Sequence, residues 1–219
     1  GSEMCIRDRL SSAFPELCPA DPAPQPSVPA AEPRALTPEE ISRVNQAFAP
    51  GAEEGGVADA TPASGFFTSY YDDVRELDFA AFLEYYPDDG TLSAGDEAES
   101  DALKTLPGYP WDMSPGAVPT HRITRASVDA ALERYAGITA AELADTSGVP
   151  YLEEYDAWYT FTSDFGPGKF LCAGGEVDEA AGTARLWTEP REDGGRAELA
   201  LQRDGESWHI RSHRIVNNP

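Results

Sequence analysis

The sequence is short of basic residues. Its 219 residues include 16 Lys and Arg against 39 Asp and Glu, which gives a formal net charge of −23. Residues 51–100 alone hold thirteen acids and a single base, Arg75. A field of this sign repels both nucleic-acid phosphates and anionic lipid headgroups. We therefore expect no nucleic-acid partner and no membrane contact by the domain itself.

Long apolar runs are also lacking. No stretch approaches the roughly 18 apolar residues that suggest a membrane-spanning helix. Hydrophobic residues nevertheless make up 41% of the chain, which is enough for a core. A chain of this length accommodates one sizeable domain or two small ones.

Residues that usually carry catalysis are scarce. The chain has three Cys and three His, with no Cys-x-x-Cys, no Gly-x-Ser-x-Gly and no phosphate-binding glycine loop. Residues 88–99 resemble a calcium loop only superficially, since its sixth position holds Ser93 instead of Gly and its fifth holds Leu92. The sequence therefore predicts no cofactor, no metal site and no nucleophile–base pair.

Acidic residues leave one enzymatic alternative open. Asp72 and Asp73 are adjacent, but neighbours in sequence point in different directions, whereas glycoside hydrolysis needs two carboxylates facing each other across a cleft. A carbohydrate-active or other hydrolase using Asp156 and Asp164 remains the alternative to a non-catalytic binding domain.

The N-terminal part is not expected to fold. Residues 1–9 resemble a translated sequencing-adapter scar, so we exclude them from the fold and expect the native chain to have begun further upstream. Eight prolines lie in residues 15–38. Residues 10–36 are therefore predicted to form a disordered tether, and residues 37–219 a single domain.

Helix signals dominate residues 37–150, the helical part. Thr37-Pro38-Glu39-Glu40 is a capping box with proline at the first helical position, and Thr139-Ala140-Ala141-Glu142 is a second box. Further helices are expected from Asp78 to Tyr86, from Asp96 to Leu106, and from Thr124 to a stop at Gly137. Residues 66–71 are short, aromatic and strand-like.

Strand signals dominate residues 151–217, the sheet part. Short links containing glycine join period-2 runs, which is typical of hairpins. We therefore predict an α+β fold with N-terminal helices followed by a five-stranded antiparallel meander, by analogy with cystatin-like or NTF2-like sheets. The five expected strands are 155–163, 169–177, 183–189, 196–203 and 207–216.

Three short segments carry a resemblance. They are Phe66-Phe67-Thr68-Ser69-Tyr70-Tyr71-Asp72-Asp73, Arg134-Tyr135-Ala136-Gly137-Ile138-Thr139, and Tyr155-Asp156-Ala157-Trp158-Tyr159 with Ser163-Asp164. Across residues 37–216 the chain resembles an uncharacterised class of lipoprotein-like surface domains of Gram-positive bacteria. The resemblance implies an extracellular or cell-envelope location, with anchoring through a segment N-terminal to residue 10, and implies no chemistry.

Alternation along the last strands predicts a binding surface. It places His209, Arg211 and His213 on the outer side of the final strand, with Arg185 and Trp187 also outward. A glycan or small anionic ligand would stack on Trp187 and pair with the arginines, more strongly as the pH falls from about 7 to 5.5 and the histidines gain charge. Alternatively, these cations pair with the protein's own acids.

The two capping boxes predict the effect of single substitutions. Thr37→Ala and Thr139→Ala should each lower the free energy of unfolding by about 1 kcal/mol, because each removes an N-terminal cap. Denaturant melts of the two variants measure this. No change at either position would mean that the helices begin elsewhere.

Overall fold

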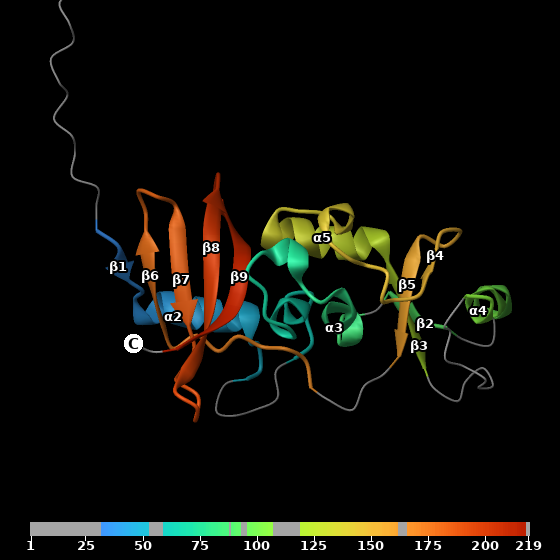
Figure 1. Ribbon diagram of the computed structural model, residues 1–219, viewed down its shortest axis with the longest axis horizontal. Helices are drawn as coiled ribbons and strands as arrows, with labels where there is room; N and C mark the ends of the chain where they lie inside the picture. Colours follow the sequence, from blue (N-terminus) through green and yellow to red (C-terminus); the bar gives the residue numbers. More distant parts are fainter. Residues whose placement is uncertain are drawn as a thin grey trace, which may run out of the picture. The chain divides into compact units, whose positions relative to one another are not determined.

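The structure, a computed structural model, describes residues 32–52, 59–87, 89–92, 96–106, 119–161 and 166–217. The adapter-like residues 1–9 and the expected tether up to residue 31 lie outside the described residues. The described part contains two antiparallel sheets joined by helices (Figure 1). The predicted arrangement of helices followed by one meander is therefore wrong.

The five-stranded sheet contains the four C-terminal strands of the predicted meander. Its order is β1-β6-β7-β8-β9, and β6 to β9 pair with their neighbours in sequence. Left-handed Gly182 and Gly205, at φ +63° and +59°, turn the β6–β7 and β8–β9 hairpins as the glycine signals predict. The strands are β1 Arg34–Ala35, β6 Gly174–Asp178, β7 Thr183–Trp187, β8 Gly195–Asp204 and β9 Ser207–Asn217.

The expected first strand of the meander belongs to a different sheet. Strand β5, Ala157–Phe161, pairs with β3, Thr120–Thr124, on one side and with β4, Tyr151–Leu152, on the other. With β2, Gly90–Thr91, these form a four-stranded sheet of order β2-β3-β5-β4. The place of β5 in the meander is instead taken by an edge strand from the N-terminal side.

That edge strand comes from the segment expected to be a tether. Arg34 pairs with Val177 and Ala35 with Glu176, and the Leu36 amide donates to the Gly175 carbonyl. Order therefore begins before the capping box at Thr37.

The helix starts agree with the capping signals. Helix α2, Pro38–Phe48, has the complete Thr37–Glu40 box, and Asp78 accepts from the Ala81 amide at the start of α3, Phe79–Glu84. Helix α4, Glu97–Lys104, falls where expected. Helix α5, Arg125–Ala136, is capped by Thr124 and ends at left-handed Gly137. The other helical turns are the short 3₁₀ helices η3 Ser64–Phe67, η4 Val74–Glu76 and η5 Ala140–Glu142.

The prediction that residues 66–71 are strand-like is wrong. Phe66 and Phe67 lie in η3, and only Tyr71 makes a bridge, to His213 of β9. Both phenylalanines are buried, so their apolar character reflects core packing.

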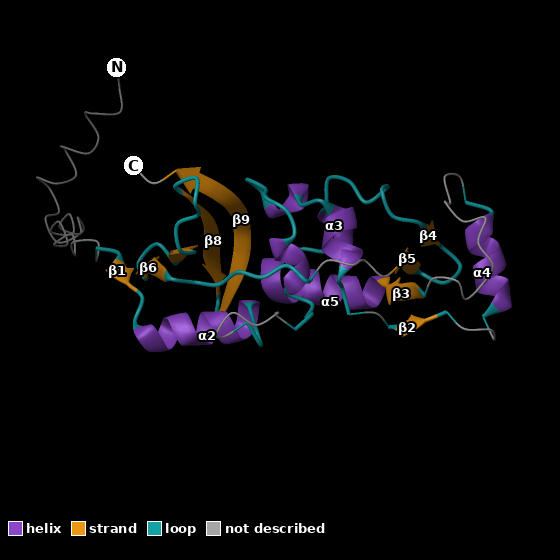
Figure 2. Cartoon of the chain, turned by 90° about the horizontal axis from the view of Figure 1, so that it is seen from below, coloured by secondary structure: helices purple, strands orange, loops and turns teal. Residues whose placement is uncertain are grey.

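One core unites the two sheets. Helix α5 packs against β9 of one sheet and β3 of the other, while α3 packs against β5. Figure 2 shows α2 running along one face of the five-stranded sheet. The core joins Trp158 of β5 to Leu186 and Ile210 of the larger sheet. A smaller cluster, with Leu103 and Tyr159, fills the other face of the four-stranded sheet under α4.

Removing the edge strand should destabilise the domain. We expect residues 37–219 to unfold at a lower urea concentration than residues 32–219. The free energy of unfolding should fall by about 1–2 kcal/mol, because the packing of Leu36 and the backbone partner of β6 are both lost. Arg34→Ala in residues 32–219 is the control and should unfold at nearly the same urea concentration as residues 32–219, since its ion pairs are exposed. Equal stability of the two chains would mean that β1 contributes nothing.

Candidate ligand-binding pocket

A β-bulge in β9 separates the two histidines and the arginine that the alternation of side chains is predicted to place on one surface. Ala200 of β8 pairs with Ser212, but the next residue, Leu201, pairs with Ile210. Arg211 is thus the extra residue on β9, and the side-chain alternation shifts by one position beyond it. No feature of the sequence around residue 211 marks the bulge.

His209 and Arg211 meet the end of α5. A Cβ at Gly137 would lie 2.6 Å from His209 Nδ1, so this glycine is required both for close approach and for its left-handed conformation. Arg211 donates to the Ala136 carbonyl at 3.1 Å. Both side chains thereby hold the helix against β9.

His213 lies in the core beyond the bulge and is only 3% exposed. The rings of Phe67, Tyr70, Tyr71 and Phe170 surround it. Its Nδ1 lies 2.7 Å from the Ser69 carbonyl, which can only accept, so Nδ1 carries the proton. Burial lowers the pKa of His213 despite this hydrogen bond. The expectation that His213 gains charge near pH 6 at a surface is therefore wrong.

Arg185 and Trp187 do share the opposite face of the sheet, as predicted, but with other partners. Arg185 and Arg214 donate to the two oxygens of fully buried Glu198 at 2.6 and 2.9 Å. Trp187 packs against Gly174 and lies under the Arg196 guanidinium, 4.4 Å away. The five predicted site residues thus occupy three separate places.

The contacts of Arg185 fit the alternative interpretation, in which the arginines pair with the protein's own acids. Burial raises the pKa of Glu198, but hydrogen bonds from Arg185 and Arg214 outweigh burial and the pKa falls below its ordinary value. Glu198 is therefore ionised at neutral pH and neutralises its neighbours.

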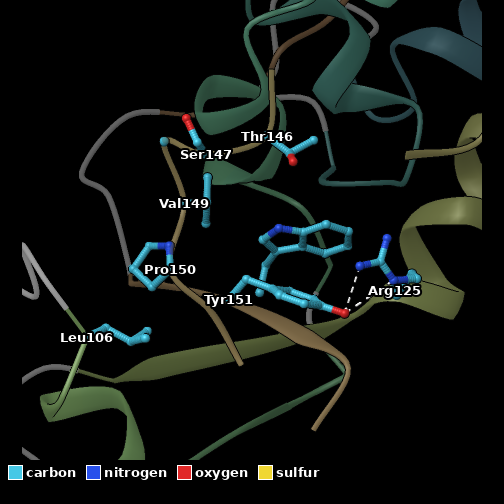
Figure 3. Close-up of a pocket in the computed structure, with 9 residues that line it drawn as sticks. Leu106, Arg125, Thr146, Ser147, Val149, Pro150 and Tyr151 are labelled. Atoms are coloured by element: carbon cyan, nitrogen blue, oxygen red, sulfur yellow. Dashed lines mark hydrogen bonds between the residues drawn. The ribbon is translucent and has the colours of Figure 1, made fainter. Parts of the chain in front are cut away.

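A pocket with polar groups lies elsewhere, beside the four-stranded sheet (Figure 3). It measures about 390 Å³. Arg125 of α5, Tyr151 of β4 and Trp158 of β5 form one part of its lining, and Leu106 contributes from beyond α4. The loop between η5 and β4 supplies Thr146, Ser147, Gly148, Val149 and Pro150.

Local hydrogen bonds shape the pocket's walls. Asp145 Oδ1 accepts from both the amide and the hydroxyl of Ser147, at 2.8 and 2.7 Å, and closes a turn. The Pro150 carbonyl accepts from the Tyr159 amide at 3.0 Å. The β4–β5 hairpin turns through Asp156, whose φ of +48° an aspartate tolerates better than most residues.

Arg125 is held by three neighbours. Its Nε donates to Asp156 Oδ1 at 2.9 Å and its Nη2 donates to the Tyr151 hydroxyl at 2.7 Å. Tyr151 in turn donates to Asp156. The guanidinium also lies over the rings of Tyr151 and Trp158, at 4.9 and 5.0 Å. These contacts fix its position before any ligand arrives.

The ionisation states of this group follow from the same contacts. Hydrogen bonds from Tyr151 and then Arg125 lower the pKa of Asp156. Burial and the bond to Asp156 raise the pKa of Tyr151. At neutral pH the cluster therefore holds a guanidinium, a carboxylate and a neutral phenol.

Asp156 does not suit the role of general acid in hydrolysis. A general acid needs a raised carboxyl pKa, whereas that of Asp156 is lowered. Buried Glu99 already accepts from Tyr159 and Arg122. Asp164, the second acid of the hydrolase alternative, lies outside the described residues. Within the described ranges, no group of three or more His, Cys, Asp or Glu could hold a metal ion.

The sequence reasoning missed most of this pocket. The sequence pattern points to Asp156 only as an acid of a hydrolase, and it does not mark Arg125 or Tyr151. The available signals were their positions, one residue after the Thr124 cap and one after the Val149-Pro150 break. Neither position forms a motif, because the hairpin that brings them together turns without glycine.

Comparison with protein-family models, curated proteins and solved structures finds no match. The resemblance to lipoprotein-like surface domains therefore remains an expectation. No helix in the described part of the chain is long and apolar enough to cross a membrane.

Buried His213 should make stability depend on pH. Below about pH 6.5 the unfolded chain binds a proton that the folded chain rejects, so the free energy of unfolding should fall as the pH drops. His213→Asn keeps a donor for the Ser69 carbonyl and should flatten this slope in urea melts between pH 7.5 and 5. Equal slopes in wild type and His213→Asn would contradict the assignment.

Proposed function

We propose that this chain is a non-catalytic binding domain whose pocket beside Arg125 takes a small acidic sugar. The observation that carries the proposal is the hydrogen bonding of the Arg125 guanidinium. Its Nε and Nη2 are engaged, while its Nη1 has no hydrogen-bond partner among the described residues. A fixed guanidinium that keeps N–H groups free beyond its pair with Asp156 can donate them to a ligand carboxylate.

The rest of the lining suits the remainder of such a ligand. The Thr146 hydroxyl can accept from or donate to a ring hydroxyl, while the Ser147 hydroxyl, which already donates to Asp145, can still accept. Tyr151 is partly exposed and offers an aromatic surface, while Val149 and Pro150 supply apolar contacts. A pocket of about 390 Å³ fits the size range of small-molecule sites.

An extracytoplasmic, tethered placement forms part of the same proposal. Its support is the proline-rich segment before the domain, together with a strong negative charge that disfavours nucleic acid. A domain that binds without transforming its ligand also accords with the engaged state of Asp156, the described acid of the hydrolase alternative.

Calorimetry with glucuronate tests the proposal. Wild type should bind glucuronate and should bind glucose, which lacks the carboxylate, at least about tenfold more weakly. Arg125→Gln should lose the preference for glucuronate. Arg134→Gln, an exposed arginine on the same helix, is the matched control and should bind as wild type does.

Two results would contradict the proposal. One is equal affinity for glucuronate and glucose in the wild type. The other is unchanged glucuronate binding by Arg125→Gln with a melting temperature close to that of wild type. Acetate as a third ligand separates recognition of a bare carboxylate from recognition of the sugar.

A further inference from the structure

A second hollow, of apolar character, lies between α2 and the five-stranded sheet. It measures about 310 Å³. Its floor includes Ala184 and Leu186 of β7 and Leu201 of β8, and its helical wall includes Val44 and Ala47. It shares no lining residue with the pocket at Arg125.

Helix α2 is fastened to the domain at its ends and along one side. Near its start, Arg34 of β1 donates to Glu40 at 2.8 and 2.9 Å. Near its end, Phe48 packs against Phe67, with ring centroids 5.2 Å apart. On one side, Asn45 exchanges two hydrogen bonds with the Cys172 backbone. These contacts fix the helix axis.

No residue of α2 is buried, although the helix carries Ile41, Val44 and Phe48 on one face. An amphipathic helix on a sheet normally buries such a face. Here Ile41, Val44 and Phe48 are partly buried against the core, and Val44 and Phe48 also border the hollow. The apolar surface there is large enough to gain from a ligand that fills it.

The arginines around the groove differ in whether a carboxylate pairs with them. Arg34 and Arg203 both reach Glu179, at 3.3 and 3.2 Å, so the cations at that end are already neutralised. Arg43 also lines the groove, and the one hydrogen bond it makes to a described residue is a long one of 3.4 Å to the Glu39 carbonyl. Within the described ranges no carboxylate pairs with Arg43.

We infer that this groove binds a single acyl chain ending in a carboxylate, with the chain between α2 and the sheet and the carboxylate at Arg43. The apolar lining selects the chain, because burial of methylene groups supplies the affinity. The unpaired guanidinium selects the head, because a charge-assisted hydrogen bond is favoured over one to a neutral oxygen. The inference is independent of the sugar pocket.

Two ligands, decanoate and decan-1-ol, test the acyl-chain part and the carboxylate part of the inference. Their binding is followed by the fluorescence of Trp208 in the groove and by calorimetry. Wild type should bind both, decanoate about tenfold more tightly. Arg43→Gln should lose this preference while its affinity for decan-1-ol is unchanged. Arg191→Gln, an exposed arginine in the β7–β8 link, should behave as wild type.

Filling the groove tests where the chain lies. Ala184→Leu should reduce the affinity for both ligands by at least about tenfold, because its side chain occupies the floor. Ala47→Leu, on the exposed helix wall, should have the same effect without disturbing the sheet, and so covers the case in which Ala184→Leu unfolds. The inference is overturned if wild type binds neither ligand, if Ala47→Leu binds both as wild type does, or if Arg43→Gln retains the preference for decanoate.

Discussion

The two sheets depend on one shared core, which takes buried side chains from the inner face of each. Trp158 comes from the smaller sheet and Leu186 and Ile210 from the larger, and all three belong to the same buried cluster. Phe66 and Phe82 join them, with ring centroids 5.1 Å apart. Their approach requires Gly65, since a Cβ there would lie 2.5 Å from the Phe82 carbonyl. Loss of this packing would free both sheets at once.

Local signals predicted local structure well. The caps at Thr37, Asp78 and Thr124 and the glycine stop at residue 137 act within a few residues, so the sequence displays them directly. Pairing between distant strands carries no such signature. A strand of the length of β5 serves either sheet, and its partner β3 follows a proline-rich stretch that hides it. The candidate pocket was missed for the same reason, because α5, β4 and β5 build it jointly.

The bulge at Arg211 shows how one residue can undo a surface prediction. Alternation is a sound rule only while both strands advance together. Here one strand gains a residue, so His213 turns into the core while Arg185 and Trp187, on an unbulged strand, stay where alternation predicts. The two hollows differ in polarity. One is polar and centres on a guanidinium held by its neighbours, and the other is apolar and lies between α2 and the five-stranded sheet.

Glu198 has a consequence for how the chain finds its fold. It is fully buried between Arg185 and Arg214, which come from the two strands beside its own. If β8 slipped by one position, its carboxylate would move to the apolar face and the two arginines would lose their shared partner. Hairpins formed in a wrong register during folding would therefore carry an unpaired charge and separate again. Glu198 therefore favours the observed register of β8 over one shifted by a single residue.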